Sequence, residues 1–286
     1  MGAVQLGIHL PQAGPAAGPQ SIREAAQLAD RLGYADVWVS DHLVVPMGAD
    51  YPPSPYIFEP LVTLTWAAAA TSRVRLGTTV LVLPMRNPLH VAKAFASLDQ
   101  LSEGRVILGT AAGWLEAEFD ALGVPFEERG QRTDEAIEVL RRMWSEDPIT
   151  ERFPVHGLAF ESIRSKPQPV GKLPIWIGGH AKAAIDRAIR VGDGWHGAFR
   201  PPEKIAAKVE RMRAARPEPE FVVSMRTGWD ALVDEHDKVL DEFGRYREVG
   251  VTHFVPEPRQ RERTAYLESI EAMASLMAGA GVDLAG

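Results

Sequence analysis

Residues 36–42, Asp-Val-Trp-Val-Ser-Asp-His, change abruptly from an apolar run to a carboxylate beside an imidazole. The apolar part has the composition of a buried strand, and Asp41 and His42 follow at its carboxyl end. The sequence is equally compatible with two interpretations of this pair. Either His42 acts as a general acid or base, or Asp41 caps a loop against which His42 packs. The fold around the strand therefore decides the function of the pair.

Strand-like and helix-like segments alternate along the whole chain. The expected strands are 4–10, 36–42, 74–83, 105–108, 174–177, 194–197, 221–225 and 252–255, and the expected helices are 21–33, 59–71, 90–101, 133–144, 181–191, 202–215, 233–249 and 263–277. The first helix should begin at Ser21, because Glu24 stands at the capping-box spacing. Eight strand–helix units in 286 residues favour an α/β fold, a closed (β/α)8 TIM barrel in one domain, over an open doubly wound sheet.

Two long segments interrupt this regular alternation. Residues 147–172, between the fourth helix and the fifth strand, are predicted to form an insertion, either a hairpin or a lid over the barrel mouth. The loop 44–58 is rich in proline and follows the second strand. Loops that follow strands lie on the catalytic face of such barrels, where Asp41 and His42 are also expected.

The composition excludes several functions. The net charge is -7 without a basic cluster, which argues against nucleic-acid binding. The absence of cysteine excludes disulfides, thiolate chemistry and cysteine-ligated metals, and no histidine pair has a third ligand at metal spacing, so no metal is expected. The N-terminus leads straight into a strand pattern, and apolar runs end before the ~20 residues of a membrane span. We therefore expect a cytoplasmic protein without a membrane partner.

Other strand ends carry weaker signals. For residues 77–84 an ordinary strand is favoured over a bulge. Residues 109–113 are small enough for a flat ligand to approach, and Trp114 offers a stacking face; a tight turn with a surface tryptophan is the alternative. Gly178-Gly179 precedes a helix at Ala181, which suits either a phosphate site or a sharp turn. Neither a Rossmann fingerprint nor a P-loop is present.

Taken together, a set of short motifs resembles the bacterial luciferase-like superfamily, and most closely its short members that use the deazaflavin coenzyme F420. The motifs, in order, are Val39-Ser40-Asp41-His42, Leu76-Gly77-Thr78-Thr79-Val80, Arg86-Asn87-Pro88, Ala92-Lys93, Ala96-Ser97-Leu98-Asp99, Ser102-Glu103-Gly104-Arg105, Gly113-Trp114-Leu115-Glu116-Ala117-Glu118-Phe119, Ile177-Gly178-Gly179 and Gly192-Asp193-Gly194-Trp195. Each motif is weak alone, but the set is specific and covers about residues 1–200.

The resemblance implies roles for particular residues. His42 would be the catalytic residue facing the reactive centre of the ring, and Asp41 would hydrogen-bond the ring or its polyol. Thr79–Val80 would form a non-prolyl cis peptide, a bulge behind the ring. The other implied cofactor-binding residues are Val82, Ala112 and Gly113, which would line the cofactor, and Gly178, Gly179, Ala181 and Lys182, which would clamp its phosphate.

The sequence departs from the family pattern at one position. Deazaflavin sugar-phosphate dehydrogenases of this superfamily carry a catalytic glutamate after the fourth strand, and here that position aligns with Trp114, while Glu116 is offset by two residues. We therefore do not expect this dehydrogenase activity. His42 is expected to handle the proton alone, or else the substrate needs little help with proton transfer.

The resemblance favours hydride transfer between coenzyme F420 and a small organic substrate, either in the reduction of an activated C=C or C=N bond or in alcohol oxidation. Tyr56, Trp114 and residues of the 147–172 segment would shape an apolar substrate pocket. An FMN-dependent monooxygenase is the main alternative, disfavoured because the larger insertions of such enzymes are absent. A non-catalytic flavin-binding barrel is a second alternative. The family also implies a homodimer and allows for a separate cofactor reductase.

Overall fold

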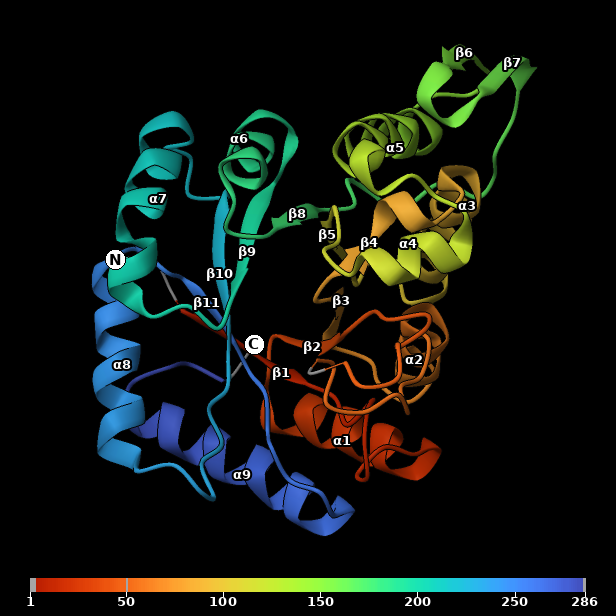
Figure 1. The fold of residues 1–286 in the computed structure, drawn as a ribbon. Coiled ribbons are helices and arrows are strands. Elements are labelled where there is room, and N and C mark those ends of the chain that lie inside the picture. Colours follow the sequence, from red (N-terminus) through yellow and green to blue (C-terminus); the bar gives the residue numbers. More distant parts are fainter. Residues whose placement is uncertain (1–3, 50, 285–286) are drawn as a thin grey trace.

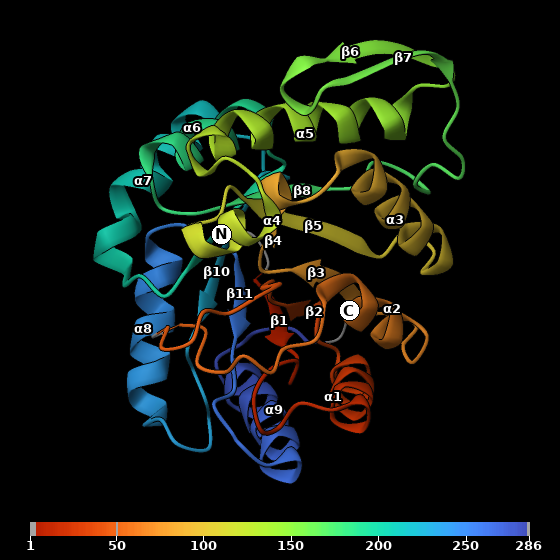
Figure 2. The ribbon, with the colours of Figure 1, turned by 45° about the vertical axis from the view of Figure 1, so that its right-hand side comes forward.

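A closed parallel barrel forms the centre of the molecule. The computed structural model describes residues 4–49 and 51–284, and within them helices surround eight barrel strands (Figures 1 and 2). The strands are β1 (Gln5–His9), β2 (Asp36–Val39), β3 (Arg75–Thr78), β5 (Val106–Ala111), β8 (Ile175–Gly178), β9 (Gly194–Ala198), β10 (Val222–Thr227) and β11 (His253–Pro256). The order β3-β2-β1-β11-β10-β9-β8-β5 closes because β3 also pairs with β5. The predicted (β/α)8 fold is thus confirmed.

Helices follow the strands, as the sequence pattern predicts. They are α1 (Pro19–Leu32), α2 (Pro60–Ala68), α3 (Pro88–Leu101), α4 (Glu116–Leu122), α5 (Arg129–Ser145), α6 (Lys182–Val191), α7 (Pro202–Ala215), α8 (His236–Glu248) and α9 (Arg263–Gly279), with 3-10 turns η1 (Leu83–Met85), η2 (Phe126–Glu128) and η3 (Pro154–His156). The expected start of α1 at Ser21 is wrong. The helix begins at Pro19, whose fixed φ suits the first helical turn. The sequence also did not predict α4, which is only seven residues long.

The third strand is broken by a bulge. β3 ends at Thr78, the Thr79–Val80 peptide is cis, and β4 (Leu81–Val82) continues the sheet. Gly77 pairs with Ile107 but Leu81 pairs with Thr110, so four steps along one strand match three along the other. The preference for an ordinary strand at 77–84 is therefore wrong, whereas the cis peptide that the family resemblance implied is present.

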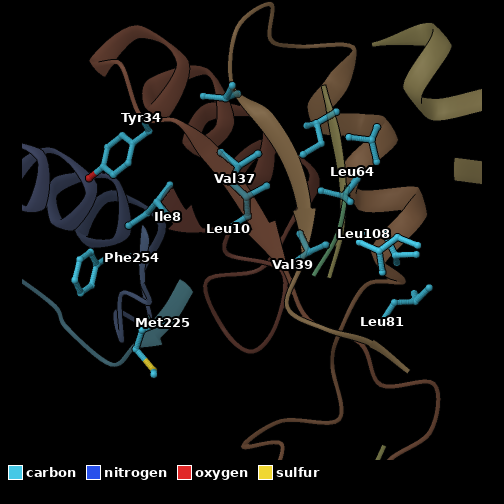
Figure 3. Close-up of a cluster of buried hydrophobic side chains, with 14 of the residues drawn as sticks. Ile8, Leu10, Tyr34, Val37, Val39, Leu64, Leu81, Leu108, Met225 and Phe254 are labelled. Carbon is cyan, nitrogen blue, oxygen red and sulfur yellow. The ribbon is translucent and has the colours of Figure 1, made fainter. Parts of the chain in front are cut away.

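The principal core lies between the strands and the helices. Alternate residues of each strand point outward, and Ile8, Val37, Val39, Leu108 and Phe254 are among those that are fully buried there (Figure 3). Their helical partners supply matching apolar faces, as a sheet covered on its outer side requires. This layer fixes where each strand ends, and thereby where the side chains that follow the strands lie.

The inside of the barrel holds a small apolar cluster together with several polar groups. Trp38 is fully buried and stacks on Trp176, with ring centroids 5.3 Å apart, and Ile107 and Val255 complete the cluster. Gly77 on the neighbouring strand leaves room for Trp38, because a Cβ atom there would lie 2.5 Å from the Trp38 ring. The buried polar side chains of the interior include His196, Ser224, Asp36, His253 and Arg226.

The insertion forms an antiparallel hairpin of β6 (Ile149–Phe153) and β7 (Leu158–Ile163). In Figures 1 and 2, α5 lies between this hairpin and the barrel strands. The backbone N–H groups of Val155 and His156 donate hydrogen bonds to the Glu135 carboxylate on α5, at 2.9 and 2.7 Å, and hold the hairpin in this position. The hairpin alternative is thus observed, but the segment packs on the outer side of α5 instead of covering the mouth as a lid.

No helix within residues 4–49 and 51–284 combines the length and the apolar character that crossing a membrane requires.

The outward-facing aromatic cluster around β11 gives a test of the fold. Phe254 is fully buried and its ring contacts those of Trp229, Phe243 and Tyr246. Replacing Phe254 with alanine should lower the free energy of unfolding by about 3–5 kcal/mol, because it leaves a cavity in this cluster. Urea-induced unfolding measures the loss. Leu101→Ala, at a side chain that is 77% exposed, should change stability by less than about 0.5 kcal/mol, and equal effects of the two substitutions would contradict the packing.

Candidate active site

A cavity of about 750 Å³ opens at the carboxyl ends of the barrel strands. Most of the predicted site residues meet there. Those that line it are Asp41, His42, Thr79, Val80, Val82, Ala112, Gly113, Trp114, Gly178, Gly179 and Ala181. They come from the ends of β2, β3, β5 and β8 and from the bulge, so neighbouring strands bring together residues that are far apart in the sequence.

Two predicted residues are not among the residues that line this cavity. Tyr56 is 55% exposed and its ring packs edge-on against Phe58 instead. Lys182 extends to Asp186 one helical turn further along α6, with 2.7 Å between the charged groups. Tyr51, from the same proline-rich loop as Tyr56, lines the cavity. The choice between two tyrosines of one irregular loop has no periodic signal in the sequence.

The partner of His42 is Glu118, which sequence reasoning missed. Nδ1 of His42 lies 2.9 Å from a Glu118 carboxylate oxygen, and both side chains are buried. The other carboxylate oxygen accepts backbone N–H bonds from Leu43, at 2.7 Å, and Val44, at 3.3 Å. Glu118 lies on α4, the helix that the sequence did not predict. The expectation that His42 lacks an acidic partner is therefore wrong.

These contacts fix the orientation and the tautomer of His42. Burial acts to raise the pKa of Glu118, but the hydrogen bonds from His42 and from the Leu43 backbone outweigh it, so the pKa is lowered and the carboxylate stays ionised. An ionised carboxylate only accepts hydrogen bonds, so Nδ1 of His42 carries a proton. The remaining ring nitrogen, Nε2, is the atom that accepts a proton when the ring is neutral and donates one when it is charged.

An aromatic wall surrounds His42. The ring of Trp114 lies edge-on to His42 with centroids 6.2 Å apart, and the ring of Tyr51 lies edge-on at 5.9 Å. Tyr51 and Trp114 also contact each other, at 6.1 Å. Trp114 is 58% exposed and thus stands at the rim. These rings offer an apolar surface next to the group that moves protons.

Asp41 is held by contacts within the protein. Its carboxylate forms a two-pronged ion pair with Arg86, at 2.6 and 2.8 Å, and accepts the Val82 backbone N–H at 2.8 Å. Through Val82 it fixes β4 directly after the cis peptide. The side chain also lines the cavity, so the predicted contact between Asp41 and a cofactor stays a prediction, while its structural function is to hold the bulge in place.

The cavity floor contains Ser40 and Arg226, neither of which the sequence singled out as a site residue. Nε2 of His9 lies 2.8 Å from the Ser40 hydroxyl, which also receives a 2.9 Å hydrogen bond from Arg226. Burial, and the charge of Arg226, lower the pKa of His9 to about 4, so its ring is neutral. Arg226 is paired with Glu257 at 2.7 Å and also donates to the Thr79 carbonyl oxygen at 3.1 Å. These contacts hold the peptide group of the bulge from below.

The far end of the cavity has the features of a phosphate site. Gly179 has a φ of 108°, a conformation that glycine adopts readily, and leads into α6, whose N-terminus has no side-chain cap. The free N–H groups of such a helix end attract an anion. Arg129 and Arg187 line the same cavity, and the guanidinium of Arg187 is paired with Asp134. Gly178 has a second function, since a Cβ there would lie 2.7 Å from a methyl group of Val80.

One buried polar atom in the cavity lining lacks a partner. Nε2 of His180 lies 2.8 Å from the carbonyl oxygen of Ala198 and 3.1 Å from the Ala198 backbone N–H. Burial lowers the pKa of His180, so the ring is neutral, and Nδ1 is a hydrogen-bond donor or acceptor according to the tautomer. Nδ1 is buried without a hydrogen-bond partner. A ligand hydroxyl is the partner it needs, and a phosphorylated polyol supplies hydroxyl groups beside its phosphate.

Comparison with known proteins agrees with this geometry. A cofactor-sized cavity with a mostly apolar lining lies at the mouth of a (β/α)8 barrel. The model of the luciferase-like monooxygenase family matches residues 3–284. The chain belongs to this family, whose members include oxidoreductases that differ in cofactor.

Relatives with known activities include both F420-dependent and FMNH2-dependent enzymes. An F420-dependent glucose-6-phosphate dehydrogenase of Kineococcus radiotolerans is 37% identical over 183 residues, 62% of this chain and 52% of the relative. An FMNH2-dependent dimethylsulfone monooxygenase of Pseudomonas fluorescens is 32% identical over 195 residues, 67% of this chain and 51% of the relative. The chain thus matches about half the length of each of these enzymes.

Solved structures share the fold. The monooxygenase RslO1 of Streptomyces bottropensis superposes with a TM-score of 0.81 at 21% identity, over 97% of this chain and 99% of the other. An F420-dependent secondary alcohol dehydrogenase superposes with a TM-score of 0.77 at 20% identity, over 95% and 99%. At these identities the match supports the barrel architecture and says nothing about the substrate.

The Glu118 contacts predict how stability depends on pH. Because folding lowers the pKa of Glu118, its contribution to stability is present above the unfolded value, about 4.3, and is lost as the pH falls through the folded value. Glu118→Gln should therefore cost about 1–3 kcal/mol at neutral pH and progressively less on acidification. Urea unfolding at several pH values measures this. Glu116→Gln, at an exposed residue of the same helix, is the control, and a cost that does not vary with pH would refute the assignment.

Proposed function

We propose that this protein is an oxidoreductase that transfers a hydride between coenzyme F420 and a small organic substrate. The observation that carries the proposal is the His42–Glu118 pair, a proton donor and acceptor at the mouth of a cavity whose other end suits a phosphate. Hydride transfer to or from an organic molecule is accompanied by movement of one proton, and His42 supplies one site for it.

The residues present fit a phosphorylated tricyclic cofactor. The Thr79–Val80 bulge and the Ala111–Gly113 stretch give flat, mostly apolar surfaces, and the uncapped end of α6 gives an anion site. The unpaired Nδ1 of His180 is suited to a hydroxyl of the polyol. When bound, the deazaflavin supplies a hydride donor or acceptor, and the chemistry below concerns the protein's own groups.

His42 is the proton-transfer group of the proposal. In the direction of reduction, hydride adds to the carbon of a C=C or C=N bond and Nε2 of His42 gives its proton to the neighbouring atom. In alcohol oxidation, Nε2 accepts the hydroxyl proton as hydride leaves the carbon. Glu118 stabilises the charged imidazolium through Nδ1, at 2.9 Å. Tyr51 and Trp114 keep water from this nitrogen and form the substrate side of the pocket.

An FMN-dependent monooxygenase is the second candidate, favoured by the similarity to the FMNH2-dependent dimethylsulfone monooxygenase. The same cavity accommodates either ring. F420 is preferred because the chain carries only the short β6–β7 hairpin as an insertion and because the F420-dependent relative is 37% identical. A barrel that binds a flavin without catalysis is disfavoured because the buried acid–imidazole pair lines the cofactor-sized cavity, where paired ionisable groups of this kind commonly serve proton transfer.

The cofactor choice is open to a direct measurement. Purified protein is titrated with F420 and, in parallel, with FMN, each in oxidised and reduced form, and binding is followed by absorbance and fluorescence. We expect F420 to bind more tightly than FMN in both redox states. Tight binding of FMN with none of F420 would replace the first candidate by the monooxygenase, and binding of neither would remove both.

The function of His42 is tested by substitution. With F420 and a panel of secondary alcohols and activated alkenes or imines, His42→Ala should lower kcat by about 10²–10⁴-fold while the affinity for F420 changes little. Glu118→Gln should lower kcat less and alter its pH dependence, because Nδ1 then lacks an anionic partner. His90→Ala, at an exposed histidine of α3, is the matched control. Unchanged turnover in His42→Ala would rule out its catalytic function.

A further inference from the structure

A chain of hydrogen bonds runs through the barrel interior, from the cavity floor to the opposite end. The hydroxyl of Thr79 lies 2.7 Å from Nε2 of His196, and Nδ1 of His196 lies 2.8 Å from the hydroxyl of Ser224. That hydroxyl lies 2.7 Å from Nδ1 of His253, whose Nε2 is 2.9 Å from a carboxylate oxygen of Asp36. No residue of this hydrogen-bond chain is more than 6% exposed. Among its members, Thr79 and His196 line the cavity and Ser224, His253 and Asp36 do not.

Aromatic rings isolate this chain from water. Trp38 stacks on His196 with centroids 4.9 Å apart and planes inclined by 6°, and Trp176 lies edge-on to His253 at 5.0 Å. The side-chain polar atoms of His196, Ser224 and His253 therefore depend on their neighbours in this series for hydrogen bonding, whereas Asp36 also accepts from Trp38 and Arg75. If one member of the hydrogen-bond chain gains or loses a proton, the hydrogen bond to the next member must change its direction.

Charged groups around the chain settle which members can change. Burial acts to raise the pKa of Asp36, but the charges of His253 and Arg75 outweigh it and lower that pKa, so Asp36 stays ionised. Arg75 donates to Asp36 from β3 at 2.6 Å. Burial, and the charges of His253 and Arg226, lower the pKa of His196 well below its usual value, so His196 is neutral.

Arg226 lies on β10 above the chain and is itself paired with Glu257 of the β11 end. His180, which also lines the cavity, is neutral because burial lowers its pKa. With Asp36, Arg75 and His196 considered above, these are the charged and titratable groups that face the chain. The member with a polar partner on both ring nitrogens beside the ionised Asp36 is His253, which contacts Ser224 through Nδ1 and Asp36 through Nε2, and the scheme below places the second proton there.

The number of protons then determines the direction of every hydrogen bond. When His253 is neutral, its Nε2–H donates to Asp36 and its Nδ1 accepts from Ser224. Ser224 then accepts from Nδ1–H of His196, and Nε2 of His196 accepts the Thr79 hydroxyl proton. In this state the Thr79 oxygen offers the cavity only lone pairs.

A second proton on His253 reverses the chain. Its Nδ1–H now donates to Ser224, and Ser224 donates to Nδ1 of His196. The single proton of the neutral His196 ring must then be on Nε2, where it donates to Thr79. The Thr79 hydroxyl proton is released from the chain and is available to a ligand in the cavity.

We propose that Thr79 is a switchable hydrogen-bonding group, and that the proton on His253, on the far side of Trp38, sets whether Thr79 accepts or donates at the cavity floor. His253, Ser224 and His196 are positioning residues in this scheme, since they act on the ligand through Thr79. The switch belongs to the protein alone, whereas its effect on cofactor binding rests on the proposed function.

The proton positions are measured directly in the protein without cofactor. The protein contains eight histidines, so selective ¹⁵N-histidine labelling gives a spectrum in which each ring reports its protonated nitrogen. Assignment uses His196→Gln and His253→Gln. Spectra are recorded across a pH series, and we expect the His196 proton to be on Nδ1 when His253 is neutral and on Nε2 when His253 is charged. The opposite pairing at any pH would overturn the proposal.

Two substitutions test whether the position of the His196 proton depends on His253 through the hydrogen bonds between them. In Asp36→Asn, the side-chain amide can donate to Nε2 of His253, so the chain should reverse without acid and the His196 proton should move to Nε2. In Ser224→Ala the link is absent, so the His196 proton should no longer follow His253. A His196 proton that still follows His253 in folded Ser224→Ala would refute the chain, and the wild-type measurement remains decisive if Asp36→Asn does not fold.

The effect on the cavity is measured by binding of oxidised F420 as a function of pH. In the wild type, the dissociation constant should change by about fivefold as His253 changes charge, the effect of one hydrogen bond. Thr79→Ser should retain this change and Thr79→Val should abolish it; equal pH dependence in both variants would contradict the function of Thr79. If F420 does not bind but the histidine protons are coupled, the proposed cofactor is wrong and the switch stands. If F420 binds but the histidine protons are not coupled, the proposed cofactor stands and the switch is wrong.

Discussion

Trp38 is the constraint on which the barrel interior depends. Its indole occupies the centre, and glycine is required beside it, since a Cβ atom at Gly7 would lie 2.8 Å from the indole nitrogen and one at Gly77 would lie 2.5 Å from the ring. The indole N–H donates to Asp36, so one residue both fills the space and orients the carboxylate. Trp176, Ile107 and Val255 pack against it, and the hydrogen-bonded polar residues that end at Thr79 lie alongside this cluster.

The cavity is built where the strands leave this packed centre. Beyond Trp38, β2 ends and the chain turns outward, so that Asp41 holds the bulge while His42 faces the cavity. Neighbouring residues thus have separate functions although both line the cavity, because Asp41 is paired with Arg86 and His42 with Glu118. Glu118 completes the arrangement from α4, and its hydrogen bonds to the backbone after His42 join the two loops into one rigid unit.

The sequence contained most of the fold and part of the site. Strand–helix alternation predicted the barrel, and the family resemblance predicted the cis peptide at Thr79–Val80. Glu118 was missed because α4 is too short to show a helical period, so its carboxylate and that of Glu116 could not be distinguished from sequence. The interior histidines were also missed. Their polar character contradicts the usual apolar pattern of a parallel strand, and only the closed barrel shows which face each one occupies.

The position of the β6–β7 hairpin has a consequence for how such a chain can change. The tip of the hairpin is bound to α5 where the backbone of Val155 and His156 donates to Glu135, whereas Arg129 and Gly130, at the start of the same helix, border the cavity. Glu135 follows Arg129 by less than two helical turns. The surface hairpin and the cavity wall therefore rest on the same part of one helix, so lineages that diverge in this hairpin can reshape the cavity without replacing any residue that lines it.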